Sequence, residues 1–439
     1  MDIHNDVSVF QLHESEVRGY CRRFEAVFSS ASGSIMRDVN GCEYIDFLAA
    51  CGALNYGHND PDMRTALIQH IAADGISAGL DLFTDTKRGF LDSFHRLILE
   101  PRGLDYRVQF TGPTGTNAVE AAMKLARKVT GRTNIIAFTN GFHGMSLGAL
   151  AATGSKYHRM GASLPGVSRL PFDGYFGPEI NTADFLDRLL SDPSSGIDTP
   201  AAILLETVQG EGGLNAASPA WIQRIAALAK RHDALLIIDD IQAGCGRTGT
   251  FFSFEEMNVV PDLIVMSKSI SGFGLPMAIV LIKPEWDLWR PSEHNGTFRG
   301  NTQAFVTARV ALEKFWSNNT FSETIVTRCN AVTTHLERVA ELIPGSHLKG
   351  RGMMQGISVD SGPLADKICR LCFEHGLIVE TSGANDEVIK IMAPLTTPLS
   401  LLEQGFNILL DAAAEAMAFE HPVDSARTVE DEMFANLLY

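Results

Sequence analysis

The chain has 439 residues, of which 45% are hydrophobic and 20% are charged. This composition is typical of globular proteins, so it excludes collagen-like, coiled-coil and extensively disordered architectures. The 36 Lys and Arg residues against 52 Asp and Glu residues give a net charge of −16 at pH 7. Nucleic-acid binders usually carry a basic surface, so we expect no nucleic-acid partner.

The N-terminal sequence MDIHNDVSVFQLHESE carries acids where a secretory signal needs basic residues and a long apolar core. Apolar runs such as residues 234–238 and 263–266 are far shorter than the ~20 residues that cross a bilayer. The seven cysteines are scattered, which suits a reducing compartment. We therefore expect a cytoplasmic protein with no membrane contact and no metal site, and we interpret Cys369 and Cys372 as packing residues of a helix over residues 364–375.

The middle of the chain alternates short apolar runs with amphipathic segments. Runs that are apolar throughout and alternate with helices are typical of a parallel sheet covered on both faces. The pattern predicts strands at residues 107–111, 134–139, 201–206, 234–239, 262–267 and 277–282, and helices at residues 117–130 and 219–231. The predicted fold class is therefore α/β.

The last third has a different pattern, which indicates a smaller α+β domain joined through a long helix beginning near Thr302. The predicted elements are strands 353–359, 377–379 and 388–392 and helices 364–375 and 399–417. We expect residues 1–60 to form strands and a turn that pack with this small domain. The expected domains are thus 61–318, which is large, and 319–439, which is small.

The glycine-rich turn TGPTGTN, residues 111–117, links a predicted strand to a helix expected to start at Asn117. Gly115 allows close approach of a ligand to the backbone, Thr116 adds a hydroxyl, and a helix N-terminus offers free N–H groups to a phosphate. An ordinary capped turn would have the same sequence, and no Walker lysine follows. A second glycine-rich stretch, residues 244–249, fits the dinucleotide fingerprint but lacks the helix that this fingerprint requires.

Two charged residues stand at the ends of predicted buried strands, where open α/β sheets bind ligands. Asp239 could bind a metal, orient a base or pair with a heterocyclic cation, or it could simply cap the next turn. Lys268 could act as an amine nucleophile, because burial lowers the pKa of a lysine. The alternative is a lysine whose ammonium extends to solvent.

Together with the aromatic-histidine pair Phe142-His143 after another strand, these features match the needs of pyridoxal phosphate. The phosphate would bind the glycine-rich turn, Asp239 would keep the pyridine nitrogen protonated, and Lys268 would form a Schiff base.

The ordered motifs GTNAVEAAMKLAR, GFHG, LLETVQGEGG, LLIIDDIQAGCGRTG, MSKSISGFGLP, NGTFRGN and VIKIMAPLT resemble those of class III (ω-amino-acid) aminotransferases. The segments FHGMSLGALAATG and KSISGFGLPMA are similar to the diaminobutyrate–2-oxoglutarate aminotransferases of the ectoine type. The resemblance implies a fold-type I pyridoxal-phosphate transferase, with a mostly parallel seven-stranded sheet in its large domain. It also implies a homodimer, possibly a tetramer, with shared active sites.

The resemblance assigns roles by position. Lys268 matches the covalent lysine, Asp239 the pyridinium partner, and Phe142 with His143 the residues that stack on the ring. The remaining matches are the phosphate-binding pair Gly115 and Thr116, Ile241 under the ring, Gln242 at the phenolic oxygen, Thr297 from the neighbouring subunit, and the substrate-side acids Glu206 and Glu211.

Two positions depart from the family pattern. Met145 stands where many relatives place an arginine for the distal carboxylate, and Lys390 stands where an arginine binds the α-carboxylate of glutamate. A lysine supplies charge without the bidentate geometry of a guanidinium. Lys390 and Arg299 are therefore the candidates for binding glutamate, and we expect Glu211 to pair with Lys390 when no carboxylate is bound.

These departures argue against a GABA transaminase and fit a substrate whose distal end is an amine or an aldehyde. Together with the resemblance, they imply amino transfer from L-glutamate to L-aspartate-4-semialdehyde, giving 2-oxoglutarate and L-2,4-diaminobutyrate. Three alternatives stay open at this point. They are a class III aminotransferase for ornithine or a related diamine, a pyridoxal-phosphate semialdehyde aminomutase, and a metabolite-binding protein without activity.

Overall fold

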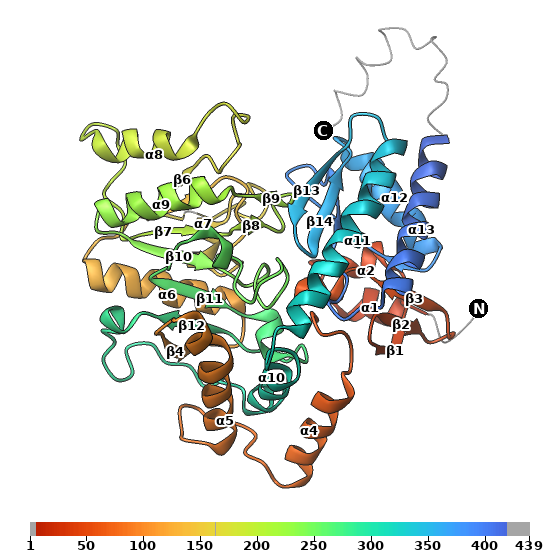
Figure 1. Cartoon of the computed structure of the whole chain (residues 1–439), viewed down its shortest axis with the longest axis horizontal. Helices are drawn as coiled ribbons and strands as arrows, with labels where there is room; N and C mark the ends of the chain where they lie inside the picture. Colours follow the sequence, from red (N-terminus) through yellow and green to blue (C-terminus); the bar gives the residue numbers. More distant parts are fainter. Residues whose placement is uncertain (1–5, 163, 419–439) are drawn as a thin grey trace.

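The computed structural model describes residues 6–162 and 164–418. Figure 1 shows two bodies side by side, with the helices α4 (Pro61–Ala72), α5 (Asp85–Phe94) and α10 (Thr302–Phe315) below and between them. The larger body is built on a seven-stranded sheet and the smaller one on two four-stranded sheets. None of the helices in the described residues is long and apolar enough to cross a membrane.

The seven-stranded sheet has the order β4-β12-β11-β10-β7-β5-β6. Its strands are β4 (Arg107–Phe110), β5 (Ile135–Phe138), β6 (Val167–Leu170), β7 (Ala202–Leu205), β10 (Leu235–Asp239), β11 (Leu263–Met266) and β12 (Ile279–Ile282). Strand β12 runs antiparallel to both of its neighbours, whereas the other pairs are parallel. The predicted mostly parallel sheet is confirmed.

Side chains alternate between the two faces of this sheet, and each face has its own core. Ile238 and Ile264 pack on the side of α9 (Pro219–Arg231), together with Trp221. Ile237 and Val265 pack on the opposite side, against the alanine-rich face of α6 (Gly115–Thr130). Both faces are therefore buried, which explains the uninterrupted apolar runs in the sequence.

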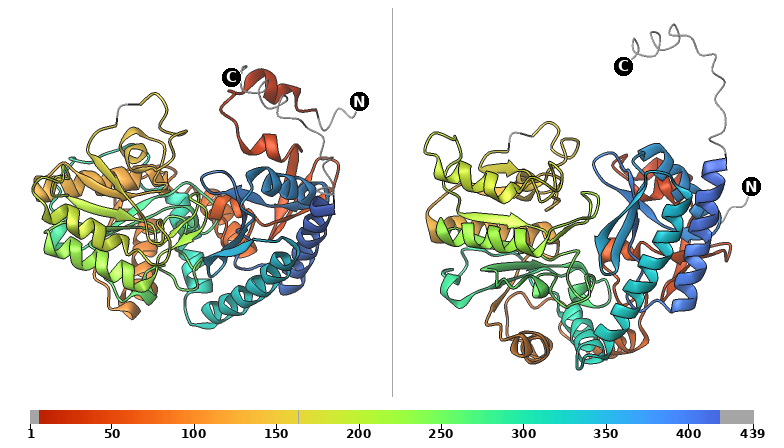
Figure 2. Two further views of the ribbon diagram at one scale, coloured as in Figure 1. Left: turned by 90° about the horizontal axis from the view of Figure 1, so that it is seen from above. Right: turned by 45° about the horizontal axis from the view of Figure 1, so that its top comes forward.

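The smaller body combines both ends of the chain. One sheet joins β1 (Phe28–Ser32), β2 (Ile35–Asp38) and β3 (Glu43–Asp46) to β15 (Leu377–Ile378), which pairs in parallel with β3. The other sheet has the order β13 (His347–Arg351), β14 (Met354–Ser358), β17 (Val388–Ile391) and β16 (Glu380–Ser382). Figure 2 shows the N-terminal strands beside the C-terminal elements in both views. On this basis we propose that residues 6–60 and 319–418 form one domain; the rest of the expected ranges 1–60 and 319–439 lies outside the described residues.

The remaining elements connect or cover these sheets. They are α1 (Ser8–His13), α2 (Tyr20–Arg23), α3 (Ala49–Gly52), α7 (Leu147–Ala152), α8 (Thr182–Ser191), α11 (Thr320–Leu342), α12 (Gly362–Glu374), α13 (Leu399–Ala418), and the hairpin β8 (Val208–Gln209) with β9 (Asn215–Ala216). Helices α11, α12 and α13 lie together over the smaller body (Figure 1). Cys369 and Cys372 are free and buried on α12.

Three expectations about the elements need correction. The helix beginning at Thr302 is not one long helix, because α10 ends at Phe315 and α11 begins at Thr320. Trp316 is the C-cap of α10, and the Oδ1 atom of Asn318 accepts a hydrogen bond from the N–H of Thr320 at 3.0 Å. Helix α6 begins at Gly115 rather than at Asn117. The sequence analysis did not predict strands β6 and β13. Both are edge strands, and their sequences VSRL and HLKGR are too short and too polar to show the pattern of a buried strand.

Candidate active site

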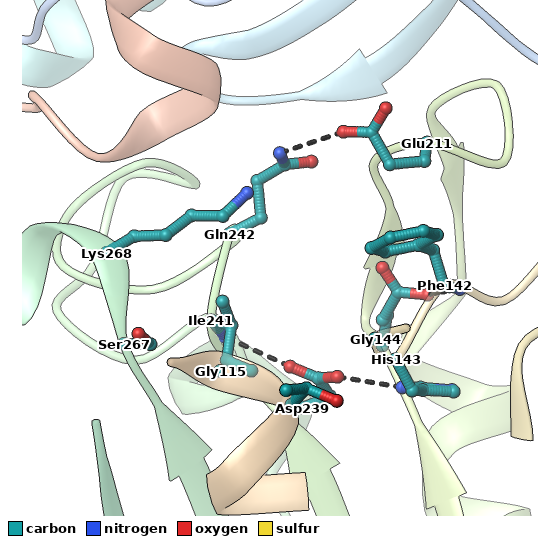
Figure 3. Close-up of a pocket in the computed structure, with 12 residues that line it drawn as sticks. Gly115, Phe142, His143, Gly144, Glu211, Asp239, Ile241, Gln242, Ser267 and Lys268 are labelled. Atoms are coloured by element: carbon teal, nitrogen blue, oxygen red, sulfur yellow. Dashed lines mark hydrogen bonds and ion pairs between the residues drawn. The ribbon is translucent and has the colours of Figure 1, made fainter. Parts of the chain in front are cut away.

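A cavity of about 160 Å³ lies at the carboxyl ends of the parallel strands. Its lining comes from loops that follow β4, β5, β7, β10 and β11, which is where this class of sheet places ligands. The lining residues are Gly115, Thr116, Phe142, His143, Gly144, Glu206, Glu211, Asp239, Ile241, Gln242, Ser267 and Lys268. The structure therefore brings together ten residues that the sequence analysis selected from segments far apart in the chain (Figure 3).

Asp239 is the last residue of β10 and is buried at the base of the cavity. Its Oδ2 atom lies 2.7 Å from Nδ1 of His143, and its Oδ1 atom accepts a hydrogen bond from the N–H of Ile241 at 3.2 Å. Burial lowers the pKa of His143, but the hydrogen bond and charge of Asp239 and the charge of Glu206 raise it above its ordinary value. These contacts hold the carboxylate of Asp239 at one fixed point of the cavity.

The N-terminus of α6 opens on the same cavity. Gly115 and Thr116 are the first two helical residues, and the N–H groups at these positions have no acceptor inside the helix. A Cβ atom on Gly115 would lie 2.8 Å from Cδ1 of Ile241, and one on Gly144 would lie 2.4 Å from Oγ1 of Thr116. The two glycines therefore keep the backbone close to the cavity. The hydroxyl of Thr116 lies 2.6 Å from that of Ser146, which adds a polar group to this end.

Lys268 lies two residues after the end of β11 and has a left-handed backbone with φ of 51°. Its Nζ atom donates a hydrogen bond to the carbonyl oxygen of Cys51 at 2.9 Å. This partner is neutral, so the amine is positioned in the cavity without an ion pair that would have to be broken. Figure 3 shows the lysine side chain extending from one side of the cavity toward Gln242.

The carbonyl of Cys51 is a site feature that the sequence analysis missed. It belongs to α3, in which Ala49, Ala50 and Cys51 all have left-handed φ values of 46° to 56° and Gly52 has φ of 85°. Left-handed backbone at successive non-glycine residues is costly and is found where surrounding contacts enforce it. Here the same carbonyl accepts hydrogen bonds from both Lys268 and Nε2 of Gln242. The unusual sequence AACG after a strand was the only available signal.

Glu206 follows β7 directly and is buried. Its carboxylate accepts hydrogen bonds from the N–H of Phe142 at 2.9 Å and of Gly210 at 3.4 Å. Burial raises the pKa of Glu206 to about 7, against the opposing charge of His143. This acid positions the loop that carries the aromatic ring.

Glu211 lies at the opposite end of the cavity from Asp239, on the loop between β8 and β9. Its Oε1 atom accepts hydrogen bonds from Nζ of Lys390 at 2.9 Å and Nε2 of Gln242 at 3.1 Å. Burial alone would raise its pKa, but the charges of Lys390 and Lys268 lower the pKa of Glu211 to about 2. The Glu211–Lys390 pair expected from the sequence is present, and the side chain of Lys390 is fully buried behind Glu211.

The sequence analysis did not select Glu380. Its Oε1 atom lies 2.8 Å from Nζ of Lys390, so the lysine contacts two carboxylates. The two residues face each other across β16 and β17, in register. An acid after the apolar run LIV and a lysine inside the next apolar run, VIKI, were the signal that could have found it.

Four selected residues do not line the cavity of this single chain. They are Lys390, which pairs with Glu211, and Thr297, Met145 and Arg299. Thr297 and Met145 are exposed. Arg299 donates a hydrogen bond to the carbonyl of His294 at 3.2 Å and forms an ion pair with Asp81, so its guanidinium is already engaged.

The cavity fits pyridoxal phosphate. The free N–H groups of α6 suit the phosphate, the buried carboxylate of Asp239 suits a protonated ring nitrogen, and Phe142 and Ile241 present apolar surfaces on opposite sides of the cavity (Figure 3). A side chain at Gly115 or Gly144 would clash with Ile241 or Thr116, which line the same cavity.

Comparison with known proteins agrees with this geometry. The sequence profile of the family described as Aminotransferase class-III matches residues 20–413. The chain belongs to the class III aminotransferases. This confirms the family predicted from the sequence, and with it pyridoxal phosphate as the cofactor.

Two curated relatives cover most of this class III chain. One is a diaminobutyrate–2-oxoglutarate transaminase of Vibrio cholerae, 54% identical over 92% of this chain and 98% of its own. Another, from Halalkalibacterium halodurans and of the same name, is 52% identical over 92% of this chain and 95% of its own.

Solved structures share the fold. A transaminase from a marine Virgibacillus has a TM-score of 0.84 at 19% identity, covering 94% of this chain and 99% of its own. An ornithine aminotransferase from Toxoplasma gondii has a TM-score of 0.80 at 23% identity, covering 94% and 95%. These confirm the predicted fold class.

Proposed function

We propose that the chain is a diaminobutyrate–2-oxoglutarate transaminase, which exchanges an amino group between L-glutamate and L-aspartate-4-semialdehyde. The products are 2-oxoglutarate and L-2,4-diaminobutyrate. The observation that carries the proposal is the gathering of Lys268, Asp239 and the α6 N-terminus around one cavity that Glu211 and Lys390 close. The names of relatives 51–54% identical to this chain support the choice of substrates.

Pyridoxal phosphate, when bound, supplies an aldehyde that takes up the amino group and a ring that withdraws electrons from the reacting carbon. Lys268 would hold it covalently and then take and return the proton at the reacting carbon. Asp239 would keep the ring nitrogen protonated, and Gly115 and Thr116 would bind the phosphate. These roles are proposals that rest on the positions of the side chains.

The pair of Glu211 and Lys390 accounts for two different substrates in one cavity. Glutamate carries a carboxylate on the carbon that bears the reacting amine, and this carboxylate can replace Glu211 at Lys390. The γ-amine of diaminobutyrate stands on a carbon without a carboxylate, so the pair can stay closed. We therefore assign the α-carboxylate of glutamate to Lys390.

The experiment that tests the function separates the two halves of the reaction. The purified enzyme is first converted to its amine-loaded form with glutamate. The change in cofactor absorbance monitors this conversion. The amine-loaded enzyme is then mixed with aspartate semialdehyde, glutamate semialdehyde or succinate semialdehyde. Fastest recovery with aspartate semialdehyde supports the proposal. Fastest recovery with another aldehyde contradicts the substrate assignment, and turnover without a 2-oxo acid would indicate an aminomutase.

We also propose that the chain forms a homodimer and that it is located in the cytoplasm. We propose further that the product of the reaction serves ectoine-type synthesis. The exposed aromatic side chains of Phe83 and Phe298, 103% and 71% exposed in the single chain, support an interface near Thr297. Light scattering coupled to size exclusion tests the dimer, because a monomeric active enzyme would contradict shared sites.

A further inference from the structure

We propose that Glu380 is a positioning residue that keeps Lys390 paired while Glu211 gives way to the carboxylate of glutamate. This inference rests on the proposed function, in which glutamate and a γ-amine share one cavity. Its basis is the contact of one buried lysine with two carboxylates, at 2.9 Å from Glu211 and 2.8 Å from Glu380.

The two acids differ in how the fold holds them. Glu380 lies on β16 directly opposite Lys390 on β17, so the backbone register of the sheet fixes their distance. On the other side of β17, Lys390 is in register with Gly356 of β14, so the central strand β17 is held from both sides. Glu380 is therefore a permanent part of the surroundings of the lysine.

Glu211 lies instead on the loop between β8 and β9 and lines the cavity, whereas Glu380 does not. The side chain of Glu211 is 31% exposed and that of Glu380 is 4% exposed. Gln242, its other partner, also lines the cavity. Of the two acids, only Glu211 can leave the lysine for the space that a substrate enters.

The charges show why a second acid is needed. The side chain of Lys390 is 0% exposed, and a buried ammonium without a counter-ion is strongly unfavourable. Burial lowers the pKa of Lys390, but the charges of Glu211 and Glu380 raise it above its ordinary value, so the lysine is an ammonium. If Glu211 were its sole partner, the exchange would pass through an unpaired buried cation. With Glu380 in place, the cation keeps one carboxylate throughout.

The consequence is a difference between the two substrates. Glutamate requires the Glu211–Lys390 contact to open, and a γ-amine does not. Glu380→Gln removes the permanent counter-ion and leaves the closed pair intact. We expect the rate constant of the glutamate half-reaction to fall by about tenfold or more in this variant. The rate constant with diaminobutyrate should change by less than about threefold, and Glu380→Asp should restore part of the loss with glutamate.

A matched control is Ser382→Ala, on the same strand. Ser382 is buried and its Oγ atom has no hydrogen-bond partner in the described structure, so this variant reports general loosening of β16. Both rate constants should stay near the wild-type values in Ser382→Ala. An equal loss with both substrates in Glu380→Gln, or no loss with either, overturns the proposal.

A second measurement does not depend on activity. Thermal unfolding of the purified enzyme is compared for Glu211→Gln, Glu380→Gln and the double variant. The fall in Tm of the double variant should exceed the sum of the single effects, because only there does Lys390 lose both carboxylates. Additive effects would overturn the shared role. If the wild-type enzyme does not react with glutamate, the proposed function is wrong. The comparison of the single and double variants by thermal unfolding still decides whether Glu211 and Glu380 can each serve as the counter-ion of Lys390.

Discussion

The carboxylate of Asp239 connects His143 to the loop that carries Ile241. Its Oδ2 atom lies 2.7 Å from Nδ1 of His143, and its Oδ1 atom accepts a hydrogen bond from the N–H of Ile241. One oxygen thus fixes the loop after β10, and the other fixes the imidazole beside the cavity. Both the negative charge and the geometry at the base of the site depend on this one residue.

Replacement of Asp239 by Asn should remove the charge and keep the shape. We expect turnover with glutamate and aspartate semialdehyde to fall by about 10²–10³-fold, because a preorganised charge in a buried site is lost. The pKa of His143, followed by NMR, should fall below its wild-type value. The control Asp233→Asn changes an exposed turn residue with left-handed φ, which Asn accepts. Near wild-type turnover in Asp239→Asn would contradict the assigned role.

Lys268→Ala removes the amine at the end of β11. We expect turnover to fall by at least about 10²–10⁴-fold from the loss of acid–base catalysis alone. The cofactor should no longer be retained after borohydride treatment and unfolding, since no covalent bond to the chain can form. Lys230→Ala, at the exposed end of α9, is the control. Substantial turnover in Lys268→Ala would show that another residue moves the proton.

Asp240, next to Asp239, predicts a pH dependence of stability. Burial, with the charges of Asp239 and Glu255, raises the pKa of Asp240 to about 7. Between about pH 4 and 7 the folded chain holds a proton that the unfolded chain releases, so stability falls as the pH rises through this window. Above pH 7 the ionised carboxylate carries the full penalty.

Asp240→Asn should flatten this decline and raise the free energy of unfolding at pH 8 by roughly 1–3 kcal/mol relative to wild type. Thermal or urea unfolding from pH 4.5 to 8 measures the effect. Part of the decline should remain, because the pKa of Glu206 is also raised to about 7. An unchanged pH profile would contradict the prediction.

The sequence predicts those parts of the fold whose cause is local or periodic. Apolar runs such as β10 and β11 are buried on both faces, so their composition identifies them, and Asp239 and Lys268 stand out because each ends such a run. The edge strand β6 bears no such pattern. The break after α10 depends on Trp316, which packs against Phe321 and donates a hydrogen bond to Tyr56, contacts that form only in the folded chain.

The site shows the same division. Glycine-rich turns and strand ends are visible in the sequence, and their meeting follows from parallel topology. The Glu380–Lys390 pair depends on the register of two strands, and the carbonyl of Cys51 reaches Lys268 through a left-handed turn. The residue types indicate unusual positions in both cases, but they do not identify the partners, because register and backbone conformation are set by tertiary contacts.

Arg247 provides a prediction about the junction of the two bodies. It is fully buried on the loop after β10, and burial lowers its pKa to about 9. Its guanidinium donates to Oδ1 of Asn55, to the carbonyl of Met353 at 3.2 Å and to the carbonyl of Ala393 at 2.6 Å. These acceptors belong to the N-terminal segment, to the residue before β14 and to the segment after β17, so one side chain connects three segments.

Arg247→Met should therefore lower the free energy of unfolding by about 3–5 kcal/mol, because several buried acceptors lose their donor. The free energy of unfolding of Arg247→Lys should lie between those of wild type and Arg247→Met, since an ammonium cannot reach all of the acceptors at once. Arg64→Met, at an exposed position of α4, is the control for loss of a surface arginine. Urea unfolding measures all three variants. If Arg247→Met unfolds at the same urea concentration as Arg64→Met, the guanidinium does not hold the segments together, and the junction depends on apolar packing.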